Sequence, residues 1–236
     1  EKSGKSLFIF QLMCALTSGQ PFLNTYNITK PCRVAYFQLE GELSDSQDRL
    51  KRMMGTQDCN PELIDYYFYP PIEMQNHSYA VGLAKTILAN GKPDILIIDP
   101  IYFAFLGSLS NDEIVRQFIG EIRILKDTLG CAVILVHHTH KQRFTVDGYG
   151  IDEGDDALFG SKFLKAWADH ILMFMYDTKK ALRTMTCTTQ RSGDIVQKCE
   201  VRLIEPNPLY FETLDKKVTV EALIIKVLFS SQNKEL

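Results

Sequence analysis

The sequence predicts an α/β fold in which a mostly parallel central sheet is flanked by helices and antiparallel strands are added at the C-terminal end. Strand-like and helical patterns alternate through residue 138, and strand-like patterns follow one another afterwards. The run DILIIDP at 94–100 is apolar nearly throughout and carries an acid near its end, which is typical of a strand buried on both faces. A chain of 236 residues is long enough to form one such domain with a substantial core.

The first predicted element is a buried helix over residues 5–18, where nearly every position except Gln11 is apolar. The helix should end in the segment TSGQP, because Gly19 favours a helix end and Pro21 cannot continue a helix. Residues 33–40, RVAYFQLE, are rich in β-branched and aromatic side chains and therefore predict a strand.

A second helix follows this strand. Ser44–Gln47 has the pattern of a capping box, which would open a helix that runs through Met54. The segment DYYFYP at 65–70 predicts a short strand, residues 78–90 predict a helix, and residues 94–100 predict the buried strand already described.

A long amphipathic helix is predicted between Asn111 and Leu129, with Ser110 or Asn111 as its cap. The run CAVILVHH at 131–138 then predicts another buried strand. The apolar positions of the helix keep a period of 3.6 residues and are Ile114, Val115, Phe118, Ile119, Ile122 and Leu125.

Residues 139–156 are polar, contain glycine and exceed the length of an ordinary connector, so we expect a functional or mobile loop. Three strands are then predicted in succession, at 170–177, 182–189 and 198–204.

The chain divides into two predicted parts. Residues 1–215 form one domain, and residues 216–236 hold a C-terminal helix with an apolar stripe. This helix either begins an appended winged-helix module or packs against the sheet.

Composition restricts the classes of function. The net charge of −3 and the sequence pI of about 6.0 exclude a broad basic face for nucleic acid, although a short basic loop could still bind it. The 6 cysteines are scattered, which excludes a CxxC zinc or redox motif and is typical of a cytoplasmic protein. No apolar run approaches the roughly 18 residues of a membrane span, and the N-terminus does not resemble a signal peptide. We expect a soluble cytoplasmic protein.

The chain begins EKSGKS, and Gly4-Lys5-Ser6 matches the end of a phosphate-binding P-loop. In such a loop backbone N–H groups face the phosphates at a helix N-terminus, the lysine reaches the β- and γ-phosphates, and the hydroxyl binds Mg²⁺. The tripeptide opens the predicted helix directly, as a P-loop should, although a bare GKS also arises by chance. The first glycine of the loop would precede Glu1.

Two acids lie at predicted strand ends. Asp99 could hold the Mg²⁺ water shell of a P-loop enzyme, and the alternative is an ordinary acid that caps the turn before Pro100. Glu40 could orient and deprotonate the water that attacks a γ-phosphate, and the alternative is a solvated acid at a strand tip.

His137 and His138 end another predicted strand, and strand alternation lets at most one of them face a nucleotide. A histidine there can hydrogen-bond the γ-phosphate, whereas zinc is disfavoured because a third ligand at sensible spacing is missing. Arg191, in TTQRSGD, suits an arginine finger that reaches a neighbouring subunit, or it is a surface arginine beside a turn.

The 139–156 loop begins with basic residues that include Lys141 and Arg143, and it also carries Phe144 and Tyr149. Basic and aromatic residues together could contact single-stranded nucleic acid. Five acids in the second half of the loop argue against this contact.

The order of these motifs, GKS, QLEGE, IIDP, VHHTHK and QRSGD, resembles that of the RecA-like ATPases. Within them it is similar to the hexameric replicative helicases of the plasmid RepA type. ALTSGQPFLN resembles the helix end and turn after the P-loop of that group, and DDALFGSKFLKAWADHILMF resembles the segment after its DNA-facing loop. The likeness spans about residues 1–215.

The resemblance implies an Mg²⁺-dependent ATPase that binds ATP and forms a ring of identical subunits, with a hexamer favoured. Single-stranded DNA is the implied partner, through Lys141 and Arg143, and no membrane is involved. The residues implied to bind the nucleotide are Ser3, Gly4, Lys5, Ser6 and Leu7.

Further roles follow from the same resemblance. Ser6 and Asp99 would hold Mg²⁺, Glu40 would be the catalytic base, and Arg191 would be the finger. The sensor falls on His138, with His137 second.

Three departures from the helicase pattern bear on function. The strand before the P-loop and the loop's first glycine are not in the chain, and we expect them upstream. Thr189 stands where related helicases carry a lysine two residues before the finger. The acidic second half of the 139–156 loop weakens the case for nucleic-acid binding. A nucleotide-switched assembly or regulatory ATPase that does not unwind DNA therefore remains the alternative to a helicase motor.

Overall fold

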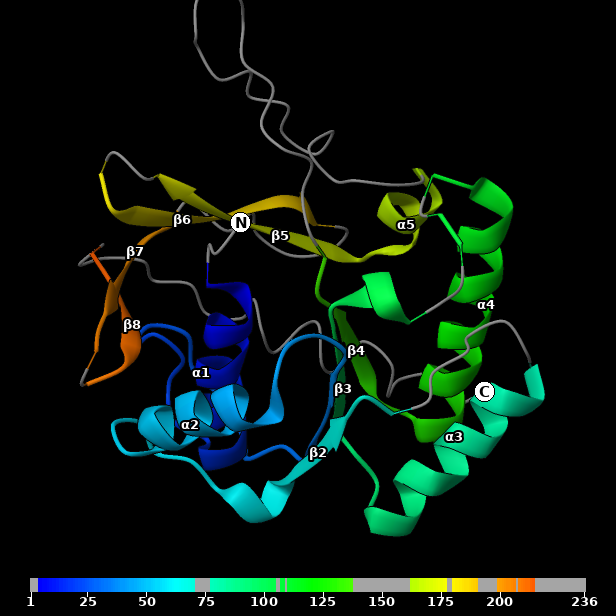
Figure 1. Ribbon diagram of the computed structural model, residues 1–236, viewed down its shortest axis with the longest axis horizontal. Coiled ribbons are helices and arrows are strands. Elements are labelled where there is room, and N and C mark those ends of the chain that lie inside the picture. The colour runs from blue at the N-terminus through cyan, green and yellow to red at the C-terminus, as the bar shows by residue number, and fades with distance from the viewer. Residues whose placement is uncertain are drawn as a thin grey trace, which may run out of the picture.

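The computed structural model describes residues 4–70, 77–104, 107–108, 110–137, 162–177, 180–190, 199–206 and 208–214. Within these ranges two four-stranded sheets flank the first helix, α1 (Lys5–Ser18). The first sheet is parallel and the second is antiparallel, so the predicted fold class is confirmed. Figure 1 shows the antiparallel strands as a separate sheet beside α1 rather than as further strands of the first sheet.

The parallel sheet has the strand order β2-β1-β3-β4. Its strands are β1 (Val34–Gln38), β2 (Ile64–Phe68), β3 (Ile95–Asp99) and β4 (Ala132–Leu135). β1 and β3 are buried at every position, as expected for central strands covered on both faces. Because the strands are parallel, their carboxyl ends meet at one edge, and this edge carries the predicted Glu40 and Asp99.

Helices cover both faces of this sheet (Figure 1). One face packs against α3 (His77–Asn90) and α4 (Asp112–Leu129), and the other packs against α1, with α2 (Leu43–Met54) beside it. The short helix α5 (Lys162–Trp167) contacts α4. Two 3₁₀ turns, η1 (Pro61–Leu63) and η2 (Ile101–Phe103), precede β2 and follow β3.

Local sequence signals explain where most helices begin and end. α1 ends at Gly19, whose left-handed backbone lets its N–H bond the carbonyl of Ala15. α4 begins after Asn111, whose side chain accepts hydrogen bonds from the backbone N–H groups of Glu113 and Ile114. The capping box predicted at Ser44–Gln47 is wrong. α2 begins two residues earlier, with Glu42 at the N-cap, and the Glu42 side chain makes no capping hydrogen bond, because Ser44 is already inside the helix.

The antiparallel sheet has the order β5-β6-β7-β8. It contains the three predicted strands, β5 (His170–Asp177), β6 (Leu182–Gln190) and β7 (Cys199–Ile204), and a fourth that the sequence patterns did not reveal, β8 (Tyr210–Thr213). The edge strand β8 packs on α1. The predicted helix within 216–236 lies outside the described residues.

Gln11 joins β8 to α1. Its amide Nε2 donates to the Phe211 carbonyl at 2.8 Å, and its Oε1 accepts from the Phe211 backbone N–H at 2.6 Å. Only 2% of Gln11 is exposed. Within the described sheet β8 is an edge strand, and the Gln11 amide supplies on its outer side the hydrogen-bond partners that a neighbouring strand would supply. Gln11, which interrupts the apolar run from Leu7 to Leu16, therefore has a structural role.

The amino edge of the parallel sheet is held by Arg33. Its guanidinium makes a two-point contact with Asp65, at 2.8 Å from Nε and 2.7 Å from Nη2, and also donates to the carbonyl of Asn90. Asp94 accepts from the backbone N–H of Arg33 at 2.8 Å. This network fixes the ends of the strands that lie farthest from Glu40 and Asp99. No helix in the described ranges is long and apolar enough to cross a bilayer.

Candidate nucleotide site

Gly4 caps the N-terminus of α1 in the left-handed region, with φ 89° and ψ 25°. Glycine adopts this backbone without strain, whereas other residues rarely do. Gly4 has no side chain with which to cap the first N–H groups of α1, and the first turn contains no acid. Unsatisfied N–H groups at a helix N-terminus attract anions, so the sequence Gly4-Lys5-Ser6 has the local structure that phosphate binding requires.

Lys5 lies among the predicted acids. Burial lowers the pKa of its ammonium group, while the nearby carboxylates of Asp99 and Glu40 oppose that shift. The fold thus brings together three of the residues singled out from the sequence, although they come from three different elements. Ser6 and Leu7 follow Lys5 in the first turn of α1, and both are half-buried.

Asp99 is the last residue of β3, and 4% of it is exposed. The hydroxyl of Tyr36, on the neighbouring strand β1, donates to its Oδ2 at 3.0 Å. Burial, with Asp99 nearby, raises the pKa of Tyr36 well above its ordinary value, so this hydroxyl remains a donor at neutral pH. The backbone carbonyl of Asp99 also accepts from the N–H of Leu39. The strand pair therefore fixes the position of the carboxylate.

Glu40 follows β1 and is exposed. Its backbone is positioned by Gln38, whose Nε2 donates to the Glu40 carbonyl at 2.7 Å. Gln38 is buried and accepts from the hydroxyl of Tyr66. The next residue, Gly41, has a φ of 86°, which turns the chain away after the acid.

Arg183 and Phe211 approach the site from the antiparallel sheet. A Cβ added to Gly4 would lie 3.2 Å from Cζ of Phe211 and 3.6 Å from Nε of Arg183. The Arg183 guanidinium stacks on the rings of Tyr176, at 4.4 Å, and Phe211, at 5.5 Å, and 8% of the residue is exposed. Burial lowers its pKa. The structure thus places a second cationic side chain beside the N-terminus of α1.

Several predicted site residues cannot be placed. Ser3, His138, Lys141, Arg143 and Arg191 lie outside the described residues. The second choice for the sensor, His137, is described. It follows Val136, whose backbone bonds Ile98 and Ile101, so it lies at the same sheet edge as Asp99.

Four site-forming residues were missed by sequence reasoning: Tyr36, Gln38, Arg183 and Phe211. Gln38 offered a signal, because it is the polar residue in an otherwise apolar strand and lies two positions before Glu40. Tyr36 looked like an ordinary strand aromatic. Arg183 and Phe211 gave no signal, since their proximity to Gly4 depends on contacts that span most of the chain.

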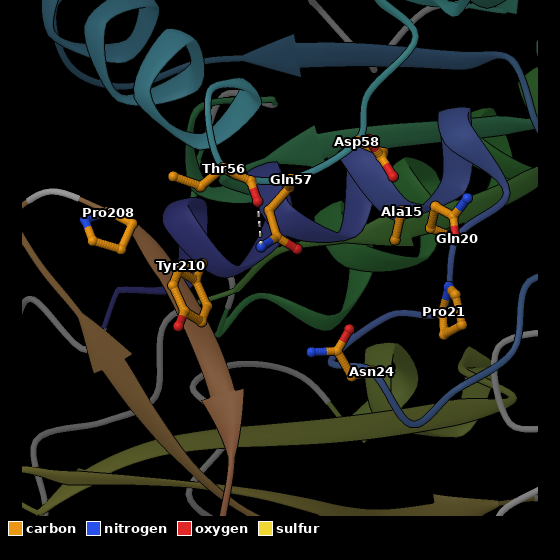
Figure 2. Close-up of a pocket in the computed structure, with 9 residues that line it drawn as sticks. All are labelled: Ala15, Gln20, Pro21, Asn24, Thr56, Gln57, Asp58, Pro208 and Tyr210. Carbon is orange, nitrogen blue, oxygen red and sulfur yellow. Dashed lines mark hydrogen bonds between the residues drawn. The ribbon is translucent and has the colours of Figure 1, made fainter.

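A separate pocket of about 550 Å³ lies toward the other end of α1 (Figure 2). Figure 2 shows Ala15 and Gln20 on one side of it and Thr56 and Gln57 on another. None of Lys5, Ser6, Glu40 or Asp99 lines it. Its lining residues are Ala15, Gln20, Pro21, Asn24, Thr56, Gln57, Asp58, Pro208 and Tyr210.

Comparison with known proteins agrees with this geometry. A solved structure described as the RadB recombinase superposes with a TM-score of 0.55 at 20% sequence identity, covering 90% of this chain and 86% of that one. At this identity the likeness shows the fold, which is RecA-like. A search of curated proteins by sequence found no match. A family model described as AAA domain matches residues 1–143, which is more than half of the 236 residues and includes Gly4, Lys5, Glu40 and Asp99. The chain therefore belongs to the AAA_25 family of AAA domains and has a RecA-like P-loop ATPase fold.

Proposed function

We propose that this protein is an Mg²⁺-dependent ATPase that acts on DNA as a ring-shaped homo-oligomer, most simply a motor of the replicative helicase type. The observation that carries the proposal is the position of Lys5. Lys5 is half-buried at the N-terminus of α1, with the Asp99 and Glu40 carboxylates nearby. This constellation matches the phosphate-binding, metal-binding and water-activating groups of a P-loop enzyme.

The residues at the site fit both ATP and Mg²⁺. Phosphate oxygens can accept from the first N–H groups of α1, which Gly4 cannot cap, and from Lys5. The Ser6 hydroxyl and the Asp99 carboxylate supply the oxygen atoms that Mg²⁺ prefers. When bound, Mg²⁺ would neutralise charge on the phosphates as the terminal phosphoryl group is transferred.

Each residue then has a distinct part in the reaction. Ser3, Gly4, Lys5, Ser6 and Leu7 hold the phosphates through backbone N–H groups and the lysine. Tyr36 keeps the Asp99 carboxylate oriented by its hydrogen bond.

Water activation falls to Glu40, an exposed carboxylate on a backbone fixed by Gln38. We assign γ-phosphate sensing to His138, with His137 second, and completion of a neighbouring site to Arg191. Arg183 could neutralise phosphate charge from the same subunit, because it lies beside Gly4.

The DNA and ring parts of the proposal have separate support. The fold is shared with a protein described as a recombinase, which favours a role on DNA. An arginine at position 191 that completes a site in trans requires a neighbouring subunit, and a hexameric ring supplies one. Lys141 and Arg143 are the proposed contacts to single-stranded DNA.

Steady-state ATP hydrolysis by the full-length protein, with and without single-stranded DNA, tests the proposal. Lys5→Ala should reduce hydrolysis about 100-fold or more because it removes a charge that stabilises the transition state. Glu40→Gln should reduce the rate about 100- to 10,000-fold while ATP binding is retained. Lys85→Ala, at an exposed position on α3, is the matched control and should hydrolyse ATP normally. Turnover that survives in Lys5→Ala or Glu40→Gln would exclude this mechanism.

A second candidate function is a nucleotide-switched assembly or regulatory ATPase that does not unwind DNA. The net charge of −3 and the acids of the 139–156 loop favour it. Several-fold stimulation of hydrolysis by single-stranded DNA supports the motor, whereas hydrolysis that is indifferent to DNA supports the switch.

Mixing the Arg191→Ala variant with the wild-type protein tests the ring. Activity that falls more steeply than the fraction of variant indicates a finger that acts in trans, and a linear fall indicates independent subunits.

A further inference from the structure

Two cysteines from distant parts of the chain meet at the side of α1. Cys14 is fully buried in a small cluster with Met53 and Leu209, and Cys59 is half-buried and packs against the same cluster. Cys59 lies in the loop between α2 and η1. Cys59 therefore lies against the cluster that contains the Cys14 side chain.

Thr17, almost one turn after Cys14, holds the Cys59 loop against the helix. Its Oγ1 lies 3.6 Å from the Cys59 sulfur and accepts from the backbone N–H of Asn60 at 3.3 Å. The same hydroxyl donates back to the carbonyl of Met13 at 2.9 Å, which fixes its orientation on the helix. Thr17 therefore anchors the backbone of the Cys59 loop to α1, beside the cluster that contains Cys14.

The environments of the two sulfurs differ. The hydrogen bond with Cys14, together with that of Thr17, lowers the pKa of Cys59 to about 7, although partial burial opposes the shift. The pKa of Cys14 is raised, because it makes the hydrogen bond with Cys59 and is buried. Cys59 is thus the better nucleophile, and Cys14 is a protonated thiol held beside it.

We propose that Cys59 and Cys14 form an oxidisable dithiol site, in which a hydroperoxide oxidises Cys59 and Cys14 then closes a disulfide between the α2–η1 loop and α1. In the first step the Cys59 thiolate attacks one peroxide oxygen, the O–O bond breaks, and a sulfenic acid forms as water leaves. In the second step the Cys14 sulfur, losing its proton, attacks the Cys59 sulfur, the S–O bond breaks, and a second water leaves. For hydrogen peroxide, two thiols and one peroxide give one disulfide and two waters.

The remaining cysteines serve as internal references. Cys32, Cys131, Cys187 and Cys199 are buried, and burial raises the pKa of Cys131 to about 12. Cys59 is the half-buried one, and the three residues before it, Thr56 to Asp58, line the pocket of Figure 2. Ala15, which follows Cys14, lines the same pocket. A small oxidant can therefore approach the Cys59 loop from the pocket.

The dithiol site is independent of the proposed nucleotide chemistry. Cys14 lies nine residues after Lys5 on the same helix, which is about 14 Å along the axis. A disulfide there would tie the helix that carries Gly4-Lys5-Ser6 to the loop after α2. The proposal can consequently be tested by chemistry on the thiols themselves, without an ATPase assay.

The test treats the full chain, folded and reduced, with a small excess of hydrogen peroxide and maps the products by peptide mass spectrometry without reduction. We expect a linked pair of peptides that contain Cys14 and Cys59 and that separate again on treatment with dithiothreitol. The matched control, Cys131→Ser, should form the same linked pair. Absence of the linked pair from the wild-type protein would overturn the proposal.

Two variants assign the roles of the sulfurs. In Cys14→Ala the sulfenic acid has no resolving thiol, so dimedone should label Cys59 at least tenfold more than any other cysteine. In Cys59→Ala neither a disulfide nor dimedone labelling of Cys14 is expected. Equal labelling of Cys59 and the buried cysteines in Cys14→Ala would contradict the assignment. The wild-type mapping stands even if either variant folds poorly.

Discussion

The hydrogen bonds of Gln11 to β8 predict a large loss of stability when this side chain becomes apolar. Gln11→Leu keeps a similar volume, so the cavity contribution should be small. It removes the partners of the Phe211 N–H and carbonyl, which lie at 2.6 and 2.8 Å. Each buried main-chain group left without a partner costs about 1–3 kcal/mol, and the two together cost about 2–6 kcal/mol. Burial of leucine instead of an amide returns about 1–3 kcal/mol. We therefore expect a net loss of about 1–3 kcal/mol.

Urea unfolding followed by circular dichroism measures this loss as a change in midpoint at constant slope. The matched control is Gln47→Leu, which changes an exposed glutamine on α2 and should alter the free energy of unfolding by less than about 0.5 kcal/mol. If Gln11→Leu falls within the range of the control, the double hydrogen bond does not hold β8 on α1, and the reasoning is refuted.

Four further predictions concern the site and its surroundings. Tyr36→Phe removes the hydrogen-bond donor to Asp99. It should lower the rate of ATP hydrolysis by a factor of about 10–100, because a hydrogen bond to a charged group contributes about 1.5–3 kcal/mol. An unchanged rate and an unchanged Mg²⁺ dependence would contradict this role of Tyr36. Gly4→Ala forces a left-handed alanine against Phe211 and should cost at least about 1–2 kcal/mol of unfolding free energy and weaken ATP binding, as measured by calorimetry. Asp65→Asn breaks the two-point contact with Arg33 and should cost about 1 kcal/mol without changing hydrolysis, because it lies at the opposite edge of the sheet. Alkylation of Cys59 by iodoacetamide should accelerate as the pH rises through about 7, because the thiolate is the reactive form. If the midpoint of the alkylation rate against pH lies above about 8, Cys14 does not stabilise the Cys59 thiolate.

The elements that the sequence predicted well are those specified by local patterns. The apolar run of α1 and the periodicity of α4 reflect burial on a scale of a few residues, and both helices end close to the predicted positions. The acids Glu40 and Asp99 were identified because strand ends are themselves local features. Their meeting with Lys5 followed from the parallel topology, which short apolar strands alternating with helices already indicated.

The parts that were missed depend on contacts between distant segments. β8 is short, and its Phe211 is stabilised by a glutamine 200 positions earlier, which no local pattern encodes. The capping box failed for a related reason, since the entry to α2 is set by the turn after Glu40 rather than by Ser44. Polar residues inside apolar runs were the best available signal for such contacts. Both Gln11 and Gln38 proved to be anchors of this kind.

The contacts of α1 link its N-terminus, where we propose that nucleotide binds, to the antiparallel sheet. Gln11 fixes β8 to the helix, and Phe211 and Arg183 lie beside Gly4 at its N-terminus. A phosphate bound at Gly4 and Lys5 would therefore change the electrostatic environment of Arg183 on β6. Alternative placements of the antiparallel sheet would differ in the distance between the Arg183 guanidinium and Gly4. A bound nucleotide would favour the placement in which the guanidinium lies closer to the phosphate charge. By linkage, any partner that binds the favoured position of the sheet must tighten nucleotide binding by the same factor. Such coupling is what both a motor and a nucleotide-switched assembly require, and Arg183→Ala should weaken it while leaving Lys5 in place.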